Sequence, residues 1–187
     1  MQEEIKNALE ILRDGGIILY PTDTIWGIGC DATQPEAVEK IFKLKHREES
    51  KSMIVLVEND RQLEEIIPEI PEVAWDIIDL AEKPTTLILD NPQKVAKNLI
   101  ASDNTLGIRR TKDDFCKRLI QQMKRPLVST SANISGEESP LSFSEISPEI
   151  LQGVDYVVNL RQNEQAAYSG SSIIKLAKNG EVKVIRI

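Results

Sequence analysis

Segments with apolar residues at helical spacing alternate along the chain with short runs that are continuously apolar. The first pattern is typical of amphipathic helices and the second of buried strands. Helical spacing covers residues 2–13, 34–44, 71–81 and 112–124. The short apolar runs cover 17–20, 53–57, 85–89, 105–109 and 127–130. This alternation predicts an α/β fold.

Local signals support the ends of the first two helices. Gly15-Gly16 follows the first helix and predicts its end. Thr33-x-x-Glu36, with Pro35 in the first turn, has the pattern of a capping box and predicts the start of the second helix.

The last third of the chain is richer in strands. Residues 134–149 hold five serines, two prolines and Gly136, which predicts a surface loop with one helical turn. Three further strands are expected at 156–160, 172–176 and 182–187. Strands that alternate with helices early and dominate late predict a mixed α/β sheet, and the chain lacks a long linker that would divide it.

Composition and charge narrow the function. The 187 residues carry a net charge of −7 and 28% charged residues, as in a soluble globular protein. No apolar stretch is long enough to span a membrane, and the acidic start predicts no secretory signal. Cys30 and Cys116 have no metal or disulfide spacing, which indicates reduced thiols in the cytoplasm. The acidic balance argues against coating nucleic acid through bulk charge.

Several enzyme classes lack their signature here. The sequence contains neither a P-loop nor a G-x-G-x-x-G fingerprint. His46 is the one histidine, so a Ser-His-Asp triad is not expected, and no cluster of metal ligands is seen.

Polar or glycine-rich segments interrupt or follow the apolar runs at five places. Binding and catalytic groups of α/β proteins commonly collect at strand ends. The five segments are 20–29, 45–51, 105–110, 129–136 and 168–172.

Several of these segments also have an explanation that requires no binding site. Pro21 and Asp23 suit an ordinary turn, although the nearby glycines would permit a close backbone approach. Lys45 and Arg47 suit a polyphosphate, but cations also complement a helix C-terminus. Arg109 ends an apolar strand and turns either to solvent or into a cleft. From the residues alone, the chain is an α/β domain suited to phosphate.

Together and in this order, the segments resemble the YrdC-like threonylcarbamoyl-AMP synthase family over nearly the whole chain. The strongest matches are Tyr-Pro-Thr-Asp-Thr-Ile-Trp-Gly-Ile-Gly-Cys-Asp-Ala at 20–32, Lys45-x-Arg47, and Ser-x-Ser-Ala-Asn-x-Ser-Gly at 129–136. The segment 84–89 and Gly107-x-Arg109 add two more. The chain resembles the short form of the family, so residues 1–187 are expected to form a single domain.

The resemblance implies both a fold and a reaction. The fold is an open, twisted mixed sheet with flanking helices and a central basic cavity. The reaction joins L-threonine, bicarbonate or CO2, and ATP into L-threonylcarbamoyladenylate, releasing pyrophosphate. This nucleotidyltransferase step begins the synthesis of threonylcarbamoyladenosine in tRNA, and a separate tRNA threonylcarbamoyl transferase complex takes up the product. Mg²⁺ would accompany ATP, no metal would be held by the protein itself, and direct RNA contact stays open.

The resemblance also assigns residues. Lys45 and Arg47 would be catalytic and would face the phosphates together with Lys51. The nucleotide would contact Thr105, Ser131, Asn133 and Arg186. Threonine would contact Thr24, Arg109 and Ser171, with Ser129 behind them, and Arg109 would bind its carboxylate. Because no covalent enzyme nucleophile is needed, positioning and electrostatics would dominate catalysis.

Four positions depart from the common family pattern. Leu56 stands where longer members often carry a histidine near threonine, and Leu141 stands where a hydroxyl residue is frequent. His46 and Arg110-Thr111 also differ from the usual residues. These departures affect substrate contacts and leave the reaction class unchanged.

Two alternatives to the synthase are also considered. A YciO-like paralogue could bind nucleotide or RNA without making the adenylate, and the intact Lys45-x-Arg47 and Ser131-Ala-Asn133 elements favour the synthase over it. A related carbamoyltransfer domain of hydrogenase maturation belongs to a much longer chain.

Overall fold

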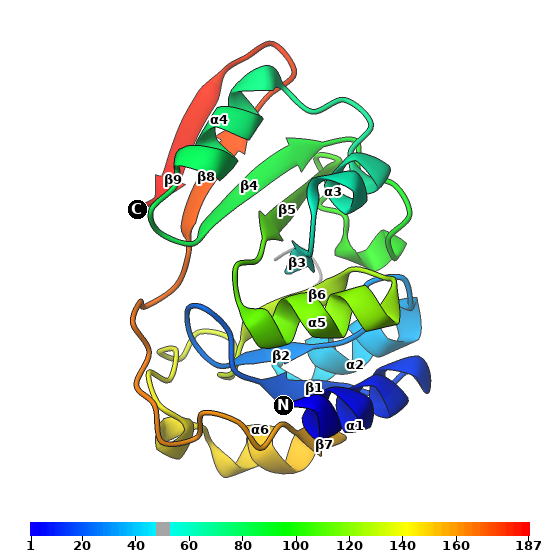
Figure 1. Cartoon of the computed structure of the whole chain (residues 1–187), viewed down its shortest axis with the longest axis vertical. Coiled ribbons are helices and arrows are strands. Elements are labelled where there is room, and N and C mark those ends of the chain that lie inside the picture. The colour runs from blue at the N-terminus through cyan, green and yellow to red at the C-terminus, as the bar shows by residue number, and fades with distance from the viewer. Residues whose placement is uncertain (48–52) are drawn as a thin grey trace.

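The computed structural model describes residues 1–47 and 53–187, and the described strands join in one mixed sheet (Figure 1). The helices are α1 (Gln2–Arg13), α2 (Pro35–Leu44), α3 (Asp60–Ile66), α4 (Glu72–Leu80), α5 (Asp114–Met123) and α6 (Pro148–Gly153). Two 3₁₀ turns are η1 (Lys97–Leu99) and η2 (Phe143–Glu145). The strands are β1 (Ile18–Tyr20), β2 (Gly27–Gly29), β3 (Ile54–Val57), β4 (Thr85–Asp90), β5 (Thr105–Arg110), β6 (Leu127–Ser131), β7 (Tyr156–Val157), β8 (Ser172–Leu176) and β9 (Val182–Arg186).

The sheet has the order β7-β1-β2-β6-β3-β5-β4-β8-β9. Three pairs are parallel, namely β1 with β7, β3 with β5 and β4 with β8. The other five pairs are antiparallel. The sheet is therefore mixed, as the sequence pattern predicts.

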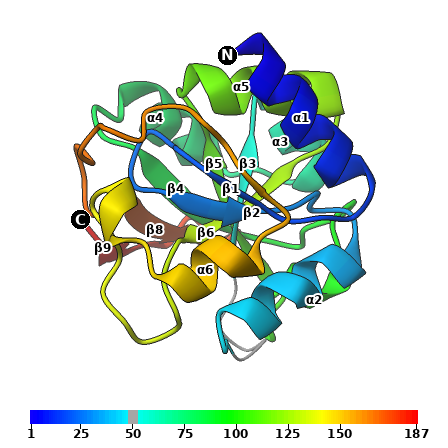
Figure 2. The ribbon, with the colours of Figure 1, turned by 90° about the horizontal axis from the view of Figure 1, so that it is seen from below.

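Helices cover both faces of the sheet. Figure 2 shows α1 and α5 on one side of the strands and α2 and α6 on the other. In β1, Ile18 and Tyr20 pack with α1 and α5, whereas Leu19 packs in the core on the opposite side. This alternation follows from the two-residue period of a strand. Both faces are thus buried, which explains why the strand segments are continuously apolar.

The structure confirms most of the expected elements and adds some that the pattern does not reveal. The short strand β2 and the helix α3 were not predicted. Helix α6 begins at the end of the segment expected to be a loop, and η2 supplies the expected helical turn. The strand expected at 156–160 is ordered as a strand only over Tyr156–Val157.

The predicted capping box is wrong. Helix α2 begins after Gln34, and no side chain caps it. The Thr33 hydroxyl instead donates to Asp31 Oδ1 at 2.7 Å, and the Thr33 amide bonds to the same oxygen. Pro35 occupies the first turn and has no N–H to satisfy, so the helix forms without the box.

Strand β2 lies very close to β6 because it carries glycine. A Cβ built on Gly29 would lie 2.3 Å from the carbonyl oxygen of Val128, which leaves no room for a side chain. The expected close backbone approach at this motif is therefore present, between two strands of the sheet.

Candidate active site

A polar cavity of about 240 Å³ opens near the middle of the sheet. Three arginines contribute to its lining, namely Arg47, Arg109 and Arg186. Its hydroxyl groups come from Thr22, Thr24, Ser129, Thr130, Ser131, Ser139, Ser169 and Ser171. Among the described residues that line the cavity, none is acidic. A protein of net charge −7 thus keeps a positively charged hollow, in agreement with the basic cavity that was expected.

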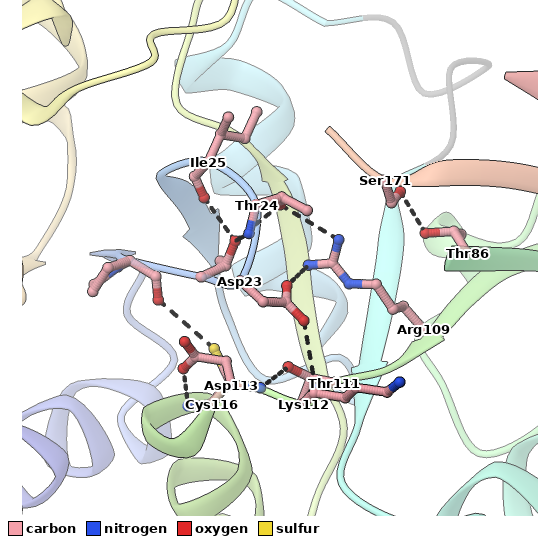
Figure 3. A network of polar contacts seen from close by, with 12 residues as sticks. Asp23, Thr24, Ile25, Thr86, Arg109, Thr111, Lys112, Asp113, Cys116 and Ser171 are labelled. Atoms are coloured by element: carbon pink, nitrogen blue, oxygen red, sulfur yellow. Dashed lines mark hydrogen bonds and ion pairs between the residues drawn. The ribbon is translucent and has the colours of Figure 1, made fainter. Parts of the chain in front are cut away.

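The loop between β1 and β2 forms one wall of the cavity and is folded by its own hydroxyl groups. Thr22 Oγ1 donates to the carbonyl of Ile25 at 2.7 Å and accepts from the amide of Thr24 at 3.0 Å. The hydroxyls of Thr22 and Thr24 are 3.0 Å apart. These contacts turn the Thr24 side chain toward the arginine at the end of β5 (Figure 3).

Arg109 is the most buried of the three arginines, with 3% of its surface exposed. Its Nη2 lies 3.0 Å from Asp23 Oδ1, and its Nη1 donates to Thr24 Oγ1 at 3.4 Å (Figure 3). Its Nε is buried and has no hydrogen-bond partner within the described part of the chain. Of the two directions open to Arg109 from the sequence, the structure shows the one into the cavity. A buried donor that lacks a partner favours an anionic ligand at this place.

The wall opposite this loop is formed by the chain entering β8 and by the last strand. Ser171 is buried, and its hydroxyl lies 2.8 Å from that of Thr86 on β4. Arg186 on the edge strand β9 donates from Nε and Nη2 to the Ser171 carbonyl. Gly170, at φ +151°, leaves room for this guanidinium, because a Cβ there would lie 2.9 Å from Arg186 Nη2. Arg186 therefore lies on an edge strand and also lines the cavity.

Lys45 is fully buried beside the cavity rather than in its lining. Its Nζ donates to the backbone carbonyls of Ser131 and Asn133, and its own carbonyl accepts from the amide of Ser135 at 2.8 Å. Burial, reinforced by the charge of Arg47, lowers the pKa of Lys45 to about 7. Lys45 thus joins the end of α2 to the segment after β6.

Arg47 and its neighbour His46 point in different directions, and only Arg47 lines the cavity. Arg47 is half-buried and lines the cavity, and burial lowers the pKa of its guanidinium below its usual range. His46 turns outward instead, with Nε2 2.8 Å from Glu149 Oε1. Lys51, expected to face phosphates, lies outside the described residues.

Two further expected residues lie away from the cavity lining. Thr105 begins β5, at the end opposite Arg109, and its hydroxyl donates to Asp103 Oδ1 at 2.7 Å. The amide of Asn133 donates to the carbonyls of Ile134 and Glu137 and so shapes the local turn. The structure therefore brings together seven of the expected residues in the lining: Thr24, Arg47, Arg109, Ser129, Ser131, Ser171 and Arg186.

Some lining residues were not predicted. Thr22 and Trp26 lie within the motif at 20–32, which was the signal that could have identified them. The Trp26 ring contacts that of Phe143, with centroids 4.9 Å apart. Ser169 lies within the polar segment 168–172, whereas Ser139 lies in a loop outside the five segments.

Residues 1–47 and 53–187 show neither a cluster of metal ligands nor a membrane-spanning helix. No group of three or more histidine, cysteine, aspartate or glutamate side chains in the described ranges is arranged to hold a metal ion. None of the helices found there has the length and apolar character needed to cross a membrane.

A mixed α/β sheet with a cavity lined by arginines and hydroxyl groups suits the binding of small anionic molecules. Residues 10–187 match the model of the Sua5_yciO_yrdC family, whose description is Telomere recombination. The chain belongs to the Sua5/YciO/YrdC family.

Relatives with assigned names cover nearly the whole chain. It is 34% identical over 186 residues to the threonylcarbamoyl-AMP synthase of Pseudoalteromonas translucida, covering 97% of each chain. It is also 34% identical over 180 residues to a putative threonylcarbamoyl-AMP synthase of Methanocaldococcus jannaschii, covering 94% of this chain and 83% of the relative.

Solved structures show the same fold. The P. abyssi Sua5 structure complexed with L-threonine is similar with a TM-score of 0.80 and 27% identity, over 92% of this chain and 50% of that chain. The chain thus spans about half the length of that Sua5 protein. The E. coli YciO structure matches with a TM-score of 0.83 and 24% identity, over 100% and 89% of the two chains, which supports the fold alone.

Proposed function

We propose that the chain is an L-threonylcarbamoyladenylate synthase, which makes threonylcarbamoyl-AMP and pyrophosphate from L-threonine, bicarbonate or CO2, and ATP. The observation that carries this proposal is the cavity itself. Three arginines and a set of neutral hydroxyls line it, with no carboxylate among the described lining residues. Threonine, bicarbonate and ATP are all anions or carry a carboxylate, so this lining suits all three reactants. The synthases with 34% identity over nearly the whole chain support the same reaction.

Threonine would bind beside Arg109. The guanidinium is held from one side by Asp23 and Thr24, and its Nε is left to donate to a ligand. A carboxylate is the natural partner for such a buried, planar donor. Ser171 on the opposite wall and Ser129 on β6 offer hydroxyls for the amino acid. The P. abyssi Sua5 complex with L-threonine supports the assignment of this ligand.

ATP would bind toward Arg47, Ser131 and Arg186. Two guanidinium groups of the cavity lining can neutralise the charge of the triphosphate. Mg²⁺ would enter as part of the MgATP substrate. Lys45 would act from behind the lining by holding the carbonyls of Ser131 and Asn133.

The chemistry requires positioning rather than a protein nucleophile. The neutral amine of threonine forms a C–N bond to CO2, giving a carbamate and releasing one proton. A carbamate oxygen then forms a bond to the α-phosphorus of ATP, and the bond to pyrophosphate breaks. The arginines stabilise the charges on the carboxylate and the phosphates, and the cavity holds the reactants at bonding distance. This sequence makes the enzyme a nucleotidyltransferase.

The remaining expectations follow from this reaction. The product would pass to a tRNA threonylcarbamoyl transferase complex in the cytoplasm, and the tRNA modification would be completed there. Thr105 would contact the nucleotide while its hydroxyl donates to Asp103. One domain over residues 1–187 is supported by the continuous order of the described strands.

The decisive experiment is pyrophosphate release from ATP by the purified protein, with threonine and bicarbonate omitted in turn. The synthase releases pyrophosphate only with both, and mass spectrometry detects threonylcarbamoyl-AMP. ATP binding without turnover, under conditions where the P. translucida relative is active, would reject the synthase in favour of a nucleotide-binding paralogue.

A further inference from the structure

Asp23 is the carboxylate that lies against the buried arginine of the cavity. Its Oδ1 is 3.0 Å from Arg109 Nη2, and its Oδ2 accepts from the amide of Lys112 at 3.4 Å (Figure 3). The aspartate therefore joins the loop between β1 and β2 to the end of β5. Its side chain is 16% exposed and that of Arg109 only 3%, so the pair is well shielded from solvent.

Asp23 does not itself line the central cavity. It faces the two smaller hollows on the other side of the loop, one shared with Arg161 and one with Lys112. A ligand in the central cavity would therefore meet Arg109 and not the carboxylate behind it.

The ion pair fixes which guanidinium donors remain for a ligand. A guanidinium has five N–H donors in one plane. Asp23 Oδ1 forms an ion pair with Nη2, and Thr24 Oγ1 accepts from Nη1. Nε and Asp23 Oδ1 are both without a hydrogen-bond partner in the described structure. The carboxylate of Asp23 opposes rotation of the guanidinium away from this arrangement.

We propose that Asp23 is a positioning residue for the threonine site, which holds the Arg109 guanidinium in the orientation that receives the ligand carboxylate. The inference rests on the proposed function for the identity of the ligand. Asp23 acts through Arg109, so its loss weakens the binding of threonine and leaves the binding of ATP nearly unchanged.

The test compares Asp23→Asn with Asp79→Asn. Asparagine keeps the shape of Asp23 and removes its charge. Asp79 forms the corresponding pair with the next arginine of β5, at 2.7 Å from Arg110 Nη2, on the exposed surface. Threonine affinity is measured by calorimetry, and the KM values for threonine and ATP are measured by pyrophosphate release.

Asp23→Asn is expected to raise the threonine Kd and KM about tenfold or more, with the ATP KM changed less than about twofold. Asp79→Asn is expected to leave both KM values unchanged. In an Arg109→Lys background, the further effect of Asp23→Asn should be much smaller, because the two residues act as one unit. Wild-type threonine affinity in Asp23→Asn, or independent effects of the two substitutions, would overturn the inference.

A crystal structure of the wild-type protein with threonine tests the same point without any variant, should Asp23→Asn fail to fold. The guanidinium is expected to keep its contact with Asp23 while it binds the carboxylate. An Arg109 that leaves Asp23 to bind threonine would overturn the inference. If the wild-type protein binds threonine but makes no adenylate, the proposed function fails, and weaker binding by Asp23→Asn still supports the role of Asp23.

Discussion

Arg186 reaches back from the last strand to hold the backbone of Ser171, with Nε 2.9 Å and Nη2 2.7 Å from the same carbonyl oxygen. The Ser171 hydroxyl is meanwhile bonded to Thr86 on β4. One residue of the cavity is thus fixed through its backbone by β9 and through its side chain by β4. Arg186 itself also belongs to the lining of the cavity.

Arg186→Lys tests the two-donor contact. Lysine keeps the charge but cannot present two donors in one plane, so we expect the catalytic efficiency with ATP to fall about tenfold. The melting temperature should change little, because β9 is an exposed edge strand. Lys183→Ala on the same strand is the control. Steady-state kinetics and a thermal melt check both outcomes, and full activity in Arg186→Lys would show that only the charge matters.

Arg47→Ala tests the phosphate assignment. The loss of a charge-assisted hydrogen bond should cost about 1.5–3 kcal/mol, or a fall of about 10- to 150-fold in kcat/KM for ATP. The protein should fold normally, because Arg47 faces the cavity rather than the apolar core. Lys43→Ala, on the exposed face of α2, is the matched control. A variant that unfolds while its folded fraction keeps full activity would refute the assignment.

The low pKa of Lys45, about 7, predicts proton uptake when nucleotide binds. At pH 7.5 much of Lys45 is neutral in the free protein. A polyanion in the adjacent cavity favours the charged form and raises the pKa, so Lys45 takes up a fraction of a proton on binding. The uptake should fade below pH 6, where the lysine is already charged.

Calorimetry in buffers of different ionisation enthalpy measures this uptake directly. Lys45→Gln should remove it, whereas Lys40→Gln, on the same helix and exposed, should retain it. Equal proton uptake in the wild type and in Lys45→Gln would assign the effect to another group.

Two glycines of β2 should separate folding from activity. Gly29→Ala places a methyl group 2.3 Å from the Val128 carbonyl, so the β2–β6 pair must open, and we expect a loss of at least about 2 kcal/mol in the free energy of unfolding. Gly27→Ala meets the Ser129 hydroxyl at 3.3 Å and narrows the cavity. It should lower activity with a much smaller loss of stability. Chemical denaturation and pyrophosphate release distinguish the two.

The sequence predicts the architecture well because strands that are buried on both faces need apolar residues at every position, and these appear as continuous apolar runs. Strand β2 escaped prediction because two of its three residues are glycine, and its place depends on close contact with β6. The false capping box arose because Thr33 bonds to Asp31, only two residues earlier in the chain. Local signals therefore fail where two of them compete for the same residue.

The sequence predicts which residues belong to the site, but it does not predict how their side chains are arranged. Motif order identified Arg109 and Ser171, and the structure brings both into one lining. The direction of the Lys45 side chain could not be read from its position, because it depends on carbonyls of a segment 86 residues away. The proposed role of Asp23 likewise depends on its contact with Arg109, which is distant in the sequence and forms only on folding.

The order in which the cavity walls are made has a consequence for biosynthesis. The first wall, around Thr24, leaves the ribosome early, whereas Arg186 belongs to the last described strand. A chain that stops before β9 lacks Arg186 and its contact with Ser171, so one wall of the cavity is incomplete. An immobilised ligand of the cavity should therefore retain chains that contain β9 more strongly than chains that stop short of it.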